Sequence, residues 1–282
     1  MLQHVPKVAK AQLRIFAPHW GSAHLSRDVF LQKAVDAGFD GVEMSLPLEL
    51  AERRRWTDAI SAAGLELVAQ QWETVLTSDF DEHKKTLRTL LENAVAAAPR
   101  FVNTHTGKDW YSFEQNSALI KLADEIATAS GVPIVHEIHR SRFSGHPTLL
   151  LPYLAAFPNL PLNADLSHWC VGCESLLHDQ KHVLAKVFPH VTHIHARVGH
   201  AQGPQVSDFR APEQAEALDA HLQWWDAIIS GQQADGRHAI TITPEFGPSP
   251  YTPTLPYTGV PVADAWELNV AMLNLLRDRY TA

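Results

Sequence analysis

The sequence predicts an α/β fold: a single (β/α)8 TIM barrel domain over residues 1–282, with long loops after its seventh and eighth strands. Short apolar runs alternate with helix-like segments along the whole chain. The runs are continuously apolar, as in parallel strands buried on both faces. The length is also close to the roughly 250 residues of a typical barrel. An open Rossmann-like sheet is the alternative, but no G-x-G-x-x-G motif follows the first apolar run.

The expected strands and helices follow one another in a regular order. The strands are expected over residues 12–17, 39–44, 66–71, 100–105, 133–138, 161–165, 191–196 and 239–245. The helices are expected over residues 26–37, 48–63, 80–98, 113–130, 146–157, 174–187, 212–230 and 263–279. In the last helix, Trp266, Val270 and Leu273 share one apolar face.

Glycine and proline mark where these helices end. A glycine just past a helix adopts the left-handed conformation that turns the chain into the next strand. Three such glycines are Gly38, Gly64 and Gly131. Proline stops a helix before other strands, at Pro99, Pro158 and Pro189.

Two expected loops are longer than ordinary connections. They run over residues 199–211, after the seventh strand, and over residues 246–262, after the eighth. Long loops in compact domains are usually functional. The second loop holds many of the 18 prolines of the chain, which stiffen it.

The composition excludes several classes of protein. The net charge is −8, so we expect no nucleic-acid partner, which normally requires a basic surface. No apolar run is long enough for a transmembrane helix, and the N-terminus does not resemble a signal peptide. The two cysteines, Cys170 and Cys173, are too few for a disulfide framework or a structural zinc site, so we expect them to pack a loop. We therefore expect a cytoplasmic protein without membrane partners; enzymes of this size often form homodimers or homotetramers.

Four strands of the second half lead into residues that bind metals or move protons. These residues are Glu137 (IVHEIHR), Asp165 (LPLNADLSHW), His195 (VTHIHARVGH) and Glu245 (ITITPEFG). In a (β/α)8 barrel the carboxyl ends of the strands share one rim, so the four side chains are expected to converge. Three carboxylates and one imidazole suit one divalent metal ion, with Mn²⁺, Mg²⁺ or Co²⁺ preferred over Zn²⁺ or Fe²⁺.

Other strand ends supply a candidate pocket for a sugar or polyol substrate. His105 and Lys108 follow the fourth strand in NTHTGKDWY. Trp20 and Trp110 offer flat apolar faces for sugar C–H groups, although rim tryptophans can also simply pack there. Glu43 ends the second strand and is expected to hydrogen-bond across the base of the pocket.

Short motifs in four successive strands resemble the xylose-isomerase-like TIM-barrel superfamily, which includes sugar phosphate isomerase/epimerase-like proteins, ketose 3-epimerases, inosose dehydratase and endonuclease IV. The motifs are E-x-H, D-x-x-H, H-x-H and P-E-F. By resemblance to the ketose 3-epimerases, the metal ligands are Glu137, Asp165, His195 and Glu245. The resemblance also implies that His168 contacts substrate. Arg197 lies close to, but not at, the position of a substrate-binding arginine in those enzymes.

Such a site supports isomerase or epimerase chemistry in carbohydrate metabolism. The metal stabilises an enediolate while Glu137 and Glu245, the expected catalytic residues, remove and return protons. If a hydroxyl leaves instead, the protein is a lyase, dehydratase or hydratase acting on a keto-sugar or inositol-type substrate. An endonuclease IV-like phosphodiesterase and a sugar-binding protein without catalysis are the remaining alternatives. A sugar phosphate substrate is less favoured, because no glycine-rich phosphate loop is present.

Overall fold

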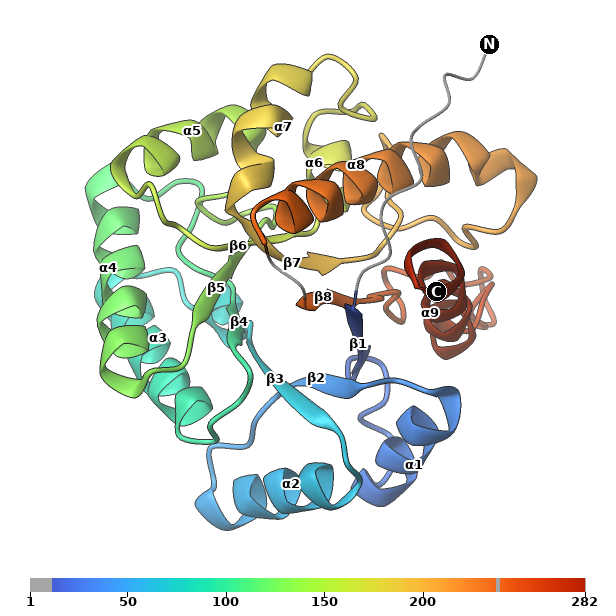
Figure 1. Cartoon of the computed structure of the whole chain (residues 1–282), viewed down its shortest axis with the longest axis horizontal. Coiled ribbons are helices and arrows are strands. Elements are labelled where there is room, and N and C mark those ends of the chain that lie inside the picture. The colour runs from blue at the N-terminus through green and yellow to red at the C-terminus, as the bar shows by residue number, and fades with distance from the viewer. Residues whose placement is uncertain (1–11, 237–238, 282) are drawn as a thin grey trace.

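The computed structural model describes residues 12–236 and 239–281, and it shows a closed parallel barrel surrounded by helices (Figure 1). The strands are β1 Gln12–Pro18, β2 Gly41–Ser45, β3 Glu66–Gln71, β4 Val102–Thr104, β5 Ile134–Glu137, β6 Leu162–Ala164, β7 Val191–His195 and β8 Ala239–Thr243. Each strand pairs in parallel with the next, and β1 also pairs with β8, which closes the ring. The predicted (β/α)8 barrel is confirmed.

The helices alternate with the strands, as the sequence predicts. They are α1 Arg27–Ala37, α2 Leu50–Ala62, α3 Phe80–Val95, α4 Phe113–Ser130, α5 Pro147–Ala156, α6 Ser167–Gly172, α7 Lys181–Val187, α8 Ala215–Ala234 and α9 Ala265–Tyr280. Three short 3-10 turns, η1 Glu73–Leu76, η2 Phe188–His190 and η3 Pro212–Gln214, complete the described elements.

The helix predicted over residues 174–187 is wrong in its first half. The short helix α6 precedes it, and only α7 falls inside the predicted range. Between the two helices, Glu174 and Leu177 have positive φ angles of 48° and 56°, a conformation that no right-handed helix contains. The unpredicted helix α6 matters for the site because it carries His168.

Local signals at the helix ends explain why most of the boundaries agree. Ser112 and Gln115 form a reciprocal capping box at the start of α4, which supplies partners for its free N–H groups. Gly38 and Gly131 follow α1 and α4 with φ angles of 83° and 73°, the left-handed conformation predicted for both.

The interior of the barrel changes from apolar to polar along the strands. Phe16, Val68, Phe101 and Val135 form a small buried cluster of their own, separate from the large core between strands and helices. Side chains two positions apart in a strand point to the same side. Asn103, two residues after Phe101, and Glu137, two residues after Val135, therefore continue the inner face toward the carboxyl ends of the strands.

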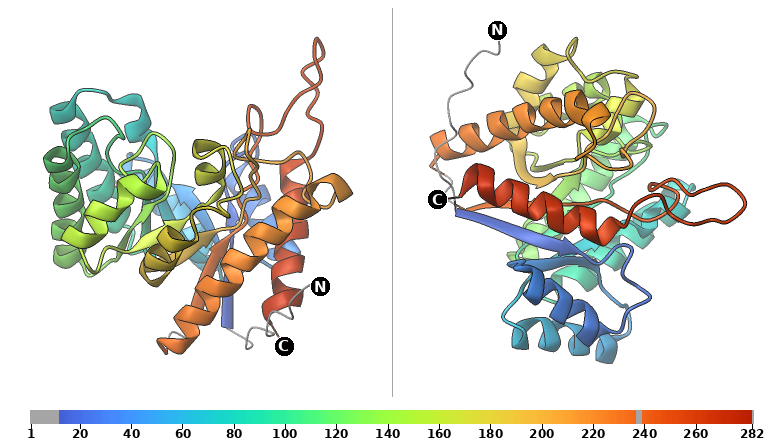
Figure 2. Two further views of the ribbon diagram at one scale, coloured as in Figure 1. Left: turned by 90° about the horizontal axis from the view of Figure 1, so that it is seen from above. Right: turned by 90° about the vertical axis from the view of Figure 1, so that its right-hand side faces the viewer.

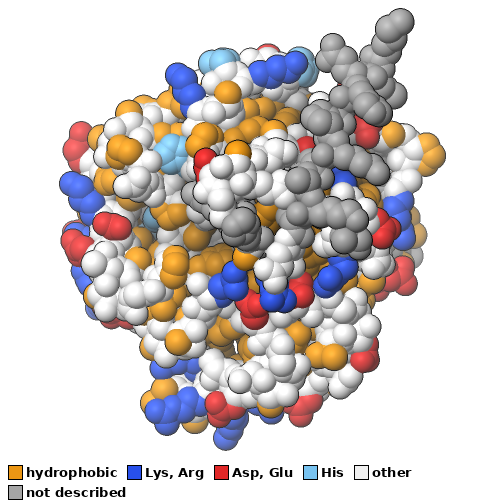
Figure 3. Space-filling model, viewed as in Figure 1, with side chains coloured by type: hydrophobic (Ala, Val, Ile, Leu, Met, Phe, Trp, Pro, Cys, Tyr) orange, Lys and Arg blue, Asp and Glu red, His pale blue; other side chains and the backbone are white. Residues whose placement is uncertain are grey.

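The segment between β8 and α9 projects beyond the barrel (Figure 2). A bridge between Thr254 and Pro261, and a 2.8 Å hydrogen bond from Leu255 N to Val260 O, hold this projection together. On the face shown in Figure 3, positive and negative side chains are interspersed. Within the described residues, no helix combines the length and apolar character needed to cross a membrane.

The buried imidazole of His221 ties α8 to the loop after β7. Its Nδ1 donates to Ala217 O at 2.8 Å, and its Nε2 accepts the Gly199 N–H at 3.2 Å. Both nitrogens are therefore used by a neutral ring. Burial lowers the pKa of His221 to about 4.

We predict that His221 makes the fold less stable in mild acid. Below about pH 6.5 the histidine of the unfolded chain takes up a proton, whereas folded His221 stays neutral down to about pH 4, so stability falls as the pH falls through this window. His221→Gln keeps an acceptor for Gly199 but does not titrate. Urea unfolding measures the free energy of unfolding of both proteins at pH 7 and pH 5. Between these pH values the wild type should lose about 2 kcal/mol more of this free energy than the variant. Equal losses in both proteins would contradict the prediction.

Candidate functional site

Four of the predicted residues converge at the carboxyl ends of the strands. One ligand-type atom from each of Glu137, Asp165, His195 and Glu245 lies within 4.8 Å of those of the other three, and all four residues are buried. Ligand atoms on opposite sides of a divalent cation are about 4 to 5 Å apart, so the spacing fits one ion. The four residues come from β5, from the ends of β6 and β8, and from β7.

His195 has one nitrogen held by the protein and one nitrogen that points at carboxylates. Its Nε2 lies 3.0 Å from Glu43 Oε1. Its Nδ1 lies 2.9 Å from Glu245 Oε2 and 3.6 Å from Glu137 Oε2, yet it has no hydrogen-bond partner of acceptable geometry. A buried nitrogen without a hydrogen bond, set among carboxylate oxygens, fits a metal ligand. The carboxylates draw protons to this ring and, against the effect of its burial, raise the pKa of His195 well above its ordinary value.

Glu43 is the partner that orients His195. It is buried and also accepts hydrogen bonds from Asn103 Nδ2 at 3.0 Å and from Thr243 Oγ1 at 2.5 Å. His193 Nε2 lies 3.4 Å from Glu43 Oε2. Burial alone raises the pKa of Glu43, but the charge of His195 and the hydrogen bonds from both histidines hold it well below the usual range. The hydrogen bonding expected of Glu43 is therefore present, and it lies beneath the four converging residues.

Sequence reasoning missed the roles of Asn103, His193 and Thr243. Asn103 Nδ2 bridges the two carboxylates, since it donates to Glu137 Oε2 at 2.6 Å as well as to Glu43. His193 lies 2.9 Å from Thr241 Oγ1 and 3.1 Å from Thr243 Oγ1. The spacing indicates that each of these side chains faces inward, because each residue stands two positions from another inward-facing residue, but it does not reveal their partners on other strands.

Glu137 and Asp165 have different electrostatic surroundings. His105 Nε2 lies 3.1 Å from Glu137 Oε1. Although burial raises the pKa of Glu137, the charges of His105 and His195 bring it well below its ordinary value. Asp165 accepts hydrogen bonds from Ser167 and Arg197. Burial raises the pKa of Asp165; Arg197 opposes that rise, and the Glu245 and Glu137 carboxylates add to it.

Arg197 lies inside this cluster. Its Nη2 donates to Asp165 and lies 3.4 Å from Glu245 Oε2 and 2.8 Å from His168 Nε2. Its guanidinium also stacks on Tyr251 at 4.7 Å. The structure thus places Arg197 where it neutralises two of the four converging residues. His168 is buried behind it, with its ring 3.7 Å from that of His139.

A cavity of about 600 Å³ opens onto the cluster, a size typical of small-molecule sites. Glu137 and Glu245 line it, together with three of the predicted substrate-binding residues, Trp20, His105 and Arg197. Gly247 allows Trp20 to lie there, because a Cβ at this glycine would be 2.1 Å from the indole ring.

The structure does not bring Lys108 or Trp110 to this cavity; neither is among the described residues that line it. Lys108 Nζ donates to Val75 O at 3.1 Å, so the ammonium joins the loops after β3 and β4. Trp110 is 61% exposed and packs edge-on against Tyr111. His168 also lies outside the lining, behind Arg197.

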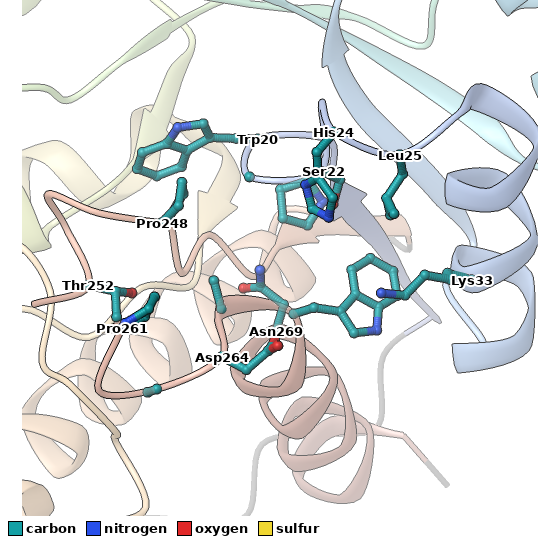
Figure 4. Close-up of a pocket in the computed structure, with 15 residues that line it drawn as sticks. Trp20, Ser22, His24, Leu25, Lys33, Pro248, Thr252, Pro261, Asp264 and Asn269 are labelled. Carbon is teal, nitrogen blue, oxygen red and sulfur yellow. The ribbon is translucent and has the colours of Figure 1, made fainter. Parts of the chain in front are cut away.

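A second cavity of about 360 Å³ lies between the loop after β1 and the start of α9 (Figure 4). Trp20 and Gly21 line both cavities, so the indole forms part of a shared wall. Lys33 stands over the Trp266 ring in this second cavity, with Nζ 4.5 Å from the ring centre. Of the converging carboxylates, Glu137 and Glu245 line the first cavity and none lines the second.

The two cysteines remain free thiols in the structure. Cys170 is fully buried in α6, and Cys173 is partly buried just after it. Burial raises the pKa of the Cys170 thiol, so the reactive thiolate is disfavoured.

Solved structures similar to this chain come from several bacteria. The probable 3-DHS dehydratase AsbF from Bacillus anthracis is 17% identical, with a TM-score of 0.62 over 94% of this chain and 99% of that one. The 3-keto-D-glucoside 4-epimerase YcjR from E. coli is 16% identical, with a TM-score of 0.56 over 95% and 100% of the two chains. A xylose isomerase-like TIM barrel protein from Mycobacterium smegmatis, in complex with magnesium, is 14% identical, with a TM-score of 0.58 over 95% and 98%.

A search of curated protein sequences gives no match. The solved structures, at these identities, establish a common fold. A family model described as Xylose isomerase-like TIM barrel matches residues 31–231. This match confirms the resemblance seen in the strand motifs, and the chain belongs to the xylose isomerase-like TIM barrel family.

Proposed function

We propose that this protein is a divalent-metal-dependent isomerase or epimerase of a sugar or polyol-derived carbonyl compound. One observation carries the proposal: three buried carboxylates lie around His195 Nδ1, which makes no hydrogen bond, and two of them, Glu137 and Glu245, line a cavity. Glu137, Asp165, His195 and Glu245 would hold the ion. The similarity to a magnesium complex supports a hard divalent cation, and the oxygen-rich donor set also suits Mn²⁺ or Co²⁺.

When bound, the metal would act as a Lewis acid for the negative charge that develops on two adjacent substrate oxygens. The proton transfers fall to the chain itself. Glu137 is held as a carboxylate by His105 and His195, so it is suited to accept a carbon-bound proton. Glu245 lines the same cavity, 2.9 Å from His195 Nδ1, and is suited to return a proton. Return to the opposite face of the same carbon gives an epimer, and return to the neighbouring carbon gives an aldose–ketose isomer.

A lyase that eliminates water from the same kind of substrate is the second candidate. The similarity to a probable dehydratase, at a TM-score of 0.62, supports it. Both reactions begin with removal of a proton beside a carbonyl group, so the two candidates share the role proposed for Glu137. Mass spectrometry separates them, because only the lyase yields a product lighter by one water.

We predict that Glu137→Gln and Glu245→Gln each lower turnover about 10²- to 10⁴-fold, because each removes a group that exchanges a proton. The assay follows solvent deuterium exchange into hydroxy-ketone and aldose substrates by NMR, with Mg²⁺ or Mn²⁺ added. Glu125→Gln, on the exposed face of α4, is the matched control and should retain full activity. Wild-type rates in either site variant, with metal bound, would refute the assigned roles.

We predict that Glu43→Gln weakens metal binding about 10- to 100-fold, because it removes the charge that orients His195. Isothermal titration calorimetry with Mn²⁺ measures the affinity, and circular dichroism checks that the barrel is intact. A chelator should abolish the activity of the wild type. Unchanged Mn²⁺ affinity in a folded Glu43→Gln protein would show that Glu43 does not support the site.

A further inference from the structure

Arg142 is a buried cation in the wall of the main cavity. It lies in the loop between β5 and α5 and is only 1% exposed. It lines the same cavity as Glu137 and Glu245. Burial lowers the pKa of its guanidinium, and the charges of Glu137 and Asp109 only partly oppose this. Yet no carboxylate in residues 12–236 or 239–281 forms an ion pair with Arg142.

One edge of the Arg142 guanidinium has no partner. Nη1 donates to Ser141 O at 2.9 Å, whereas Nε and Nη2 make no hydrogen bond. Nε and Nη2 carry the two parallel N–H groups of one edge, the arrangement that pairs with both oxygens of a carboxylate or a phosphate. The two free donors therefore fit a ligand group with two adjacent oxygens, as in a carboxylate or a phosphate.

The loop around Arg142 holds this unpaired charge in place. Ser141 has a φ of 61°, and turns bring Arg142 N to His139 O at 3.2 Å and Gly145 N to Arg142 O at 2.8 Å. Ser144 Oγ anchors the loop to Glu137 O at 2.6 Å. A buried charge without a partner is costly, and so are unsatisfied buried donors. A loop built this firmly around such a group indicates that a ligand supplies the partner.

The other guanidiniums of the cavity differ from Arg142, because Arg197 forms ion pairs and Arg140 is only half-buried. Arg197 is paired with Asp165, and Arg140 Nη2 donates to the Tyr251 hydroxyl at 3.1 Å. The positive charge of Arg142 also reaches its surroundings: burial first, and then Arg142, lowers the pKa of Lys108 to about 8. Arg142 is thus the buried cation whose binding capacity is still open.

We propose that the free edge of Arg142 binds an anionic group of the substrate, a carboxylate or a phosphate, while the carbonyl end lies at Glu137 and Glu245. The substrate is then an acidic sugar derivative, a sugar acid or a sugar phosphate, rather than a neutral sugar. This inference rests on the proposed function and adds the substrate class. It removes the sequence-based ground for disfavouring phosphorylated substrates, because an arginine edge can recognise a phosphate without a glycine-rich loop.

The test measures binding of small probes to Mg²⁺-loaded protein by isothermal titration calorimetry. The probes are inorganic phosphate, D-glycerate as a carboxylate, and glycerol as a neutral control. In Arg142→Met we expect the affinity for the preferred anion to fall about 10- to 100-fold, while binding of glycerol and Mg²⁺ is unchanged. Arg142→Lys, which keeps the charge but lacks the two-pronged edge, should recover only part of the affinity. Whichever anion depends on Arg142 identifies the class.

Arg210→Gln is the control for loss of an arginine, because Arg210 is exposed and paired with Asp208, and it should bind all probes as the wild type does. Melting temperature tests the structural alternative. Loss of an unpaired buried charge should leave Arg142→Met as stable as the wild type or more so. A lower melting temperature with unchanged anion affinity would make Arg142 structural and overturn the inference, as would a wild type that binds neither anion. Failure of the wild type to bind Mg²⁺ would instead count against the proposed function, and the anion titrations are scored separately.

Discussion

The arrangement of the site depends on how the barrel neutralises its buried carboxylates. Glu43, Glu137, Asp165 and Glu245 lie close together in a space shielded from water, where like charges repel strongly. In the structure described here, His195 and Arg197 lie among them as cations. Glu43 is the most firmly held of these carboxylates, because four neighbouring side chains contact its two oxygens. A divalent cation would complete the same balance, with His195 giving up its proton to bind through Nδ1.

The layering of the barrel interior explains why this polar cluster is tolerated. The apolar layer of Phe16, Val68, Phe101 and Val135 closes the lower part of the barrel. Above it, inward side chains bind one another: Asn103 Nδ2 donates to Glu43 and Glu137, and His193 lies between Thr241 and Thr243 of the neighbouring strand. Buried polar groups linked in this way make a rigid platform. The loops above that platform then supply Trp20, Arg142 and Tyr251, which can change without disturbing it.

Residues at strand ends could be predicted, whereas residues that support them inside the barrel could not. Glu137 and Glu245 each follow an apolar run, so a local pattern locates them at the rim. Asn103 takes its role from Glu43, 60 positions away, and no local pattern carries that pairing. Lys108 was expected at the pocket because His105 is near it in sequence, but the backbone carbonyl of Val75 binds its ammonium. The helix was wrongly predicted over residues 174–180 for a local reason. Glu174 and Leu177 have positive φ values, which interrupt a helix, but neither residue is a glycine that would have indicated this in the sequence.

The pairing of β1 with β8, which closes the barrel, determines when the site can form during folding. Thr243 and Glu43, which meet at the floor of the site, are separated by 200 positions along the chain. Contacts over such distances form slowly, because a long loop must be closed first. A nascent or truncated chain that stops before β8 therefore lacks Glu245 and the hydroxyl that steadies Glu43. Only the finished barrel would then hold the proposed cation, which would add to the stability of that state alone.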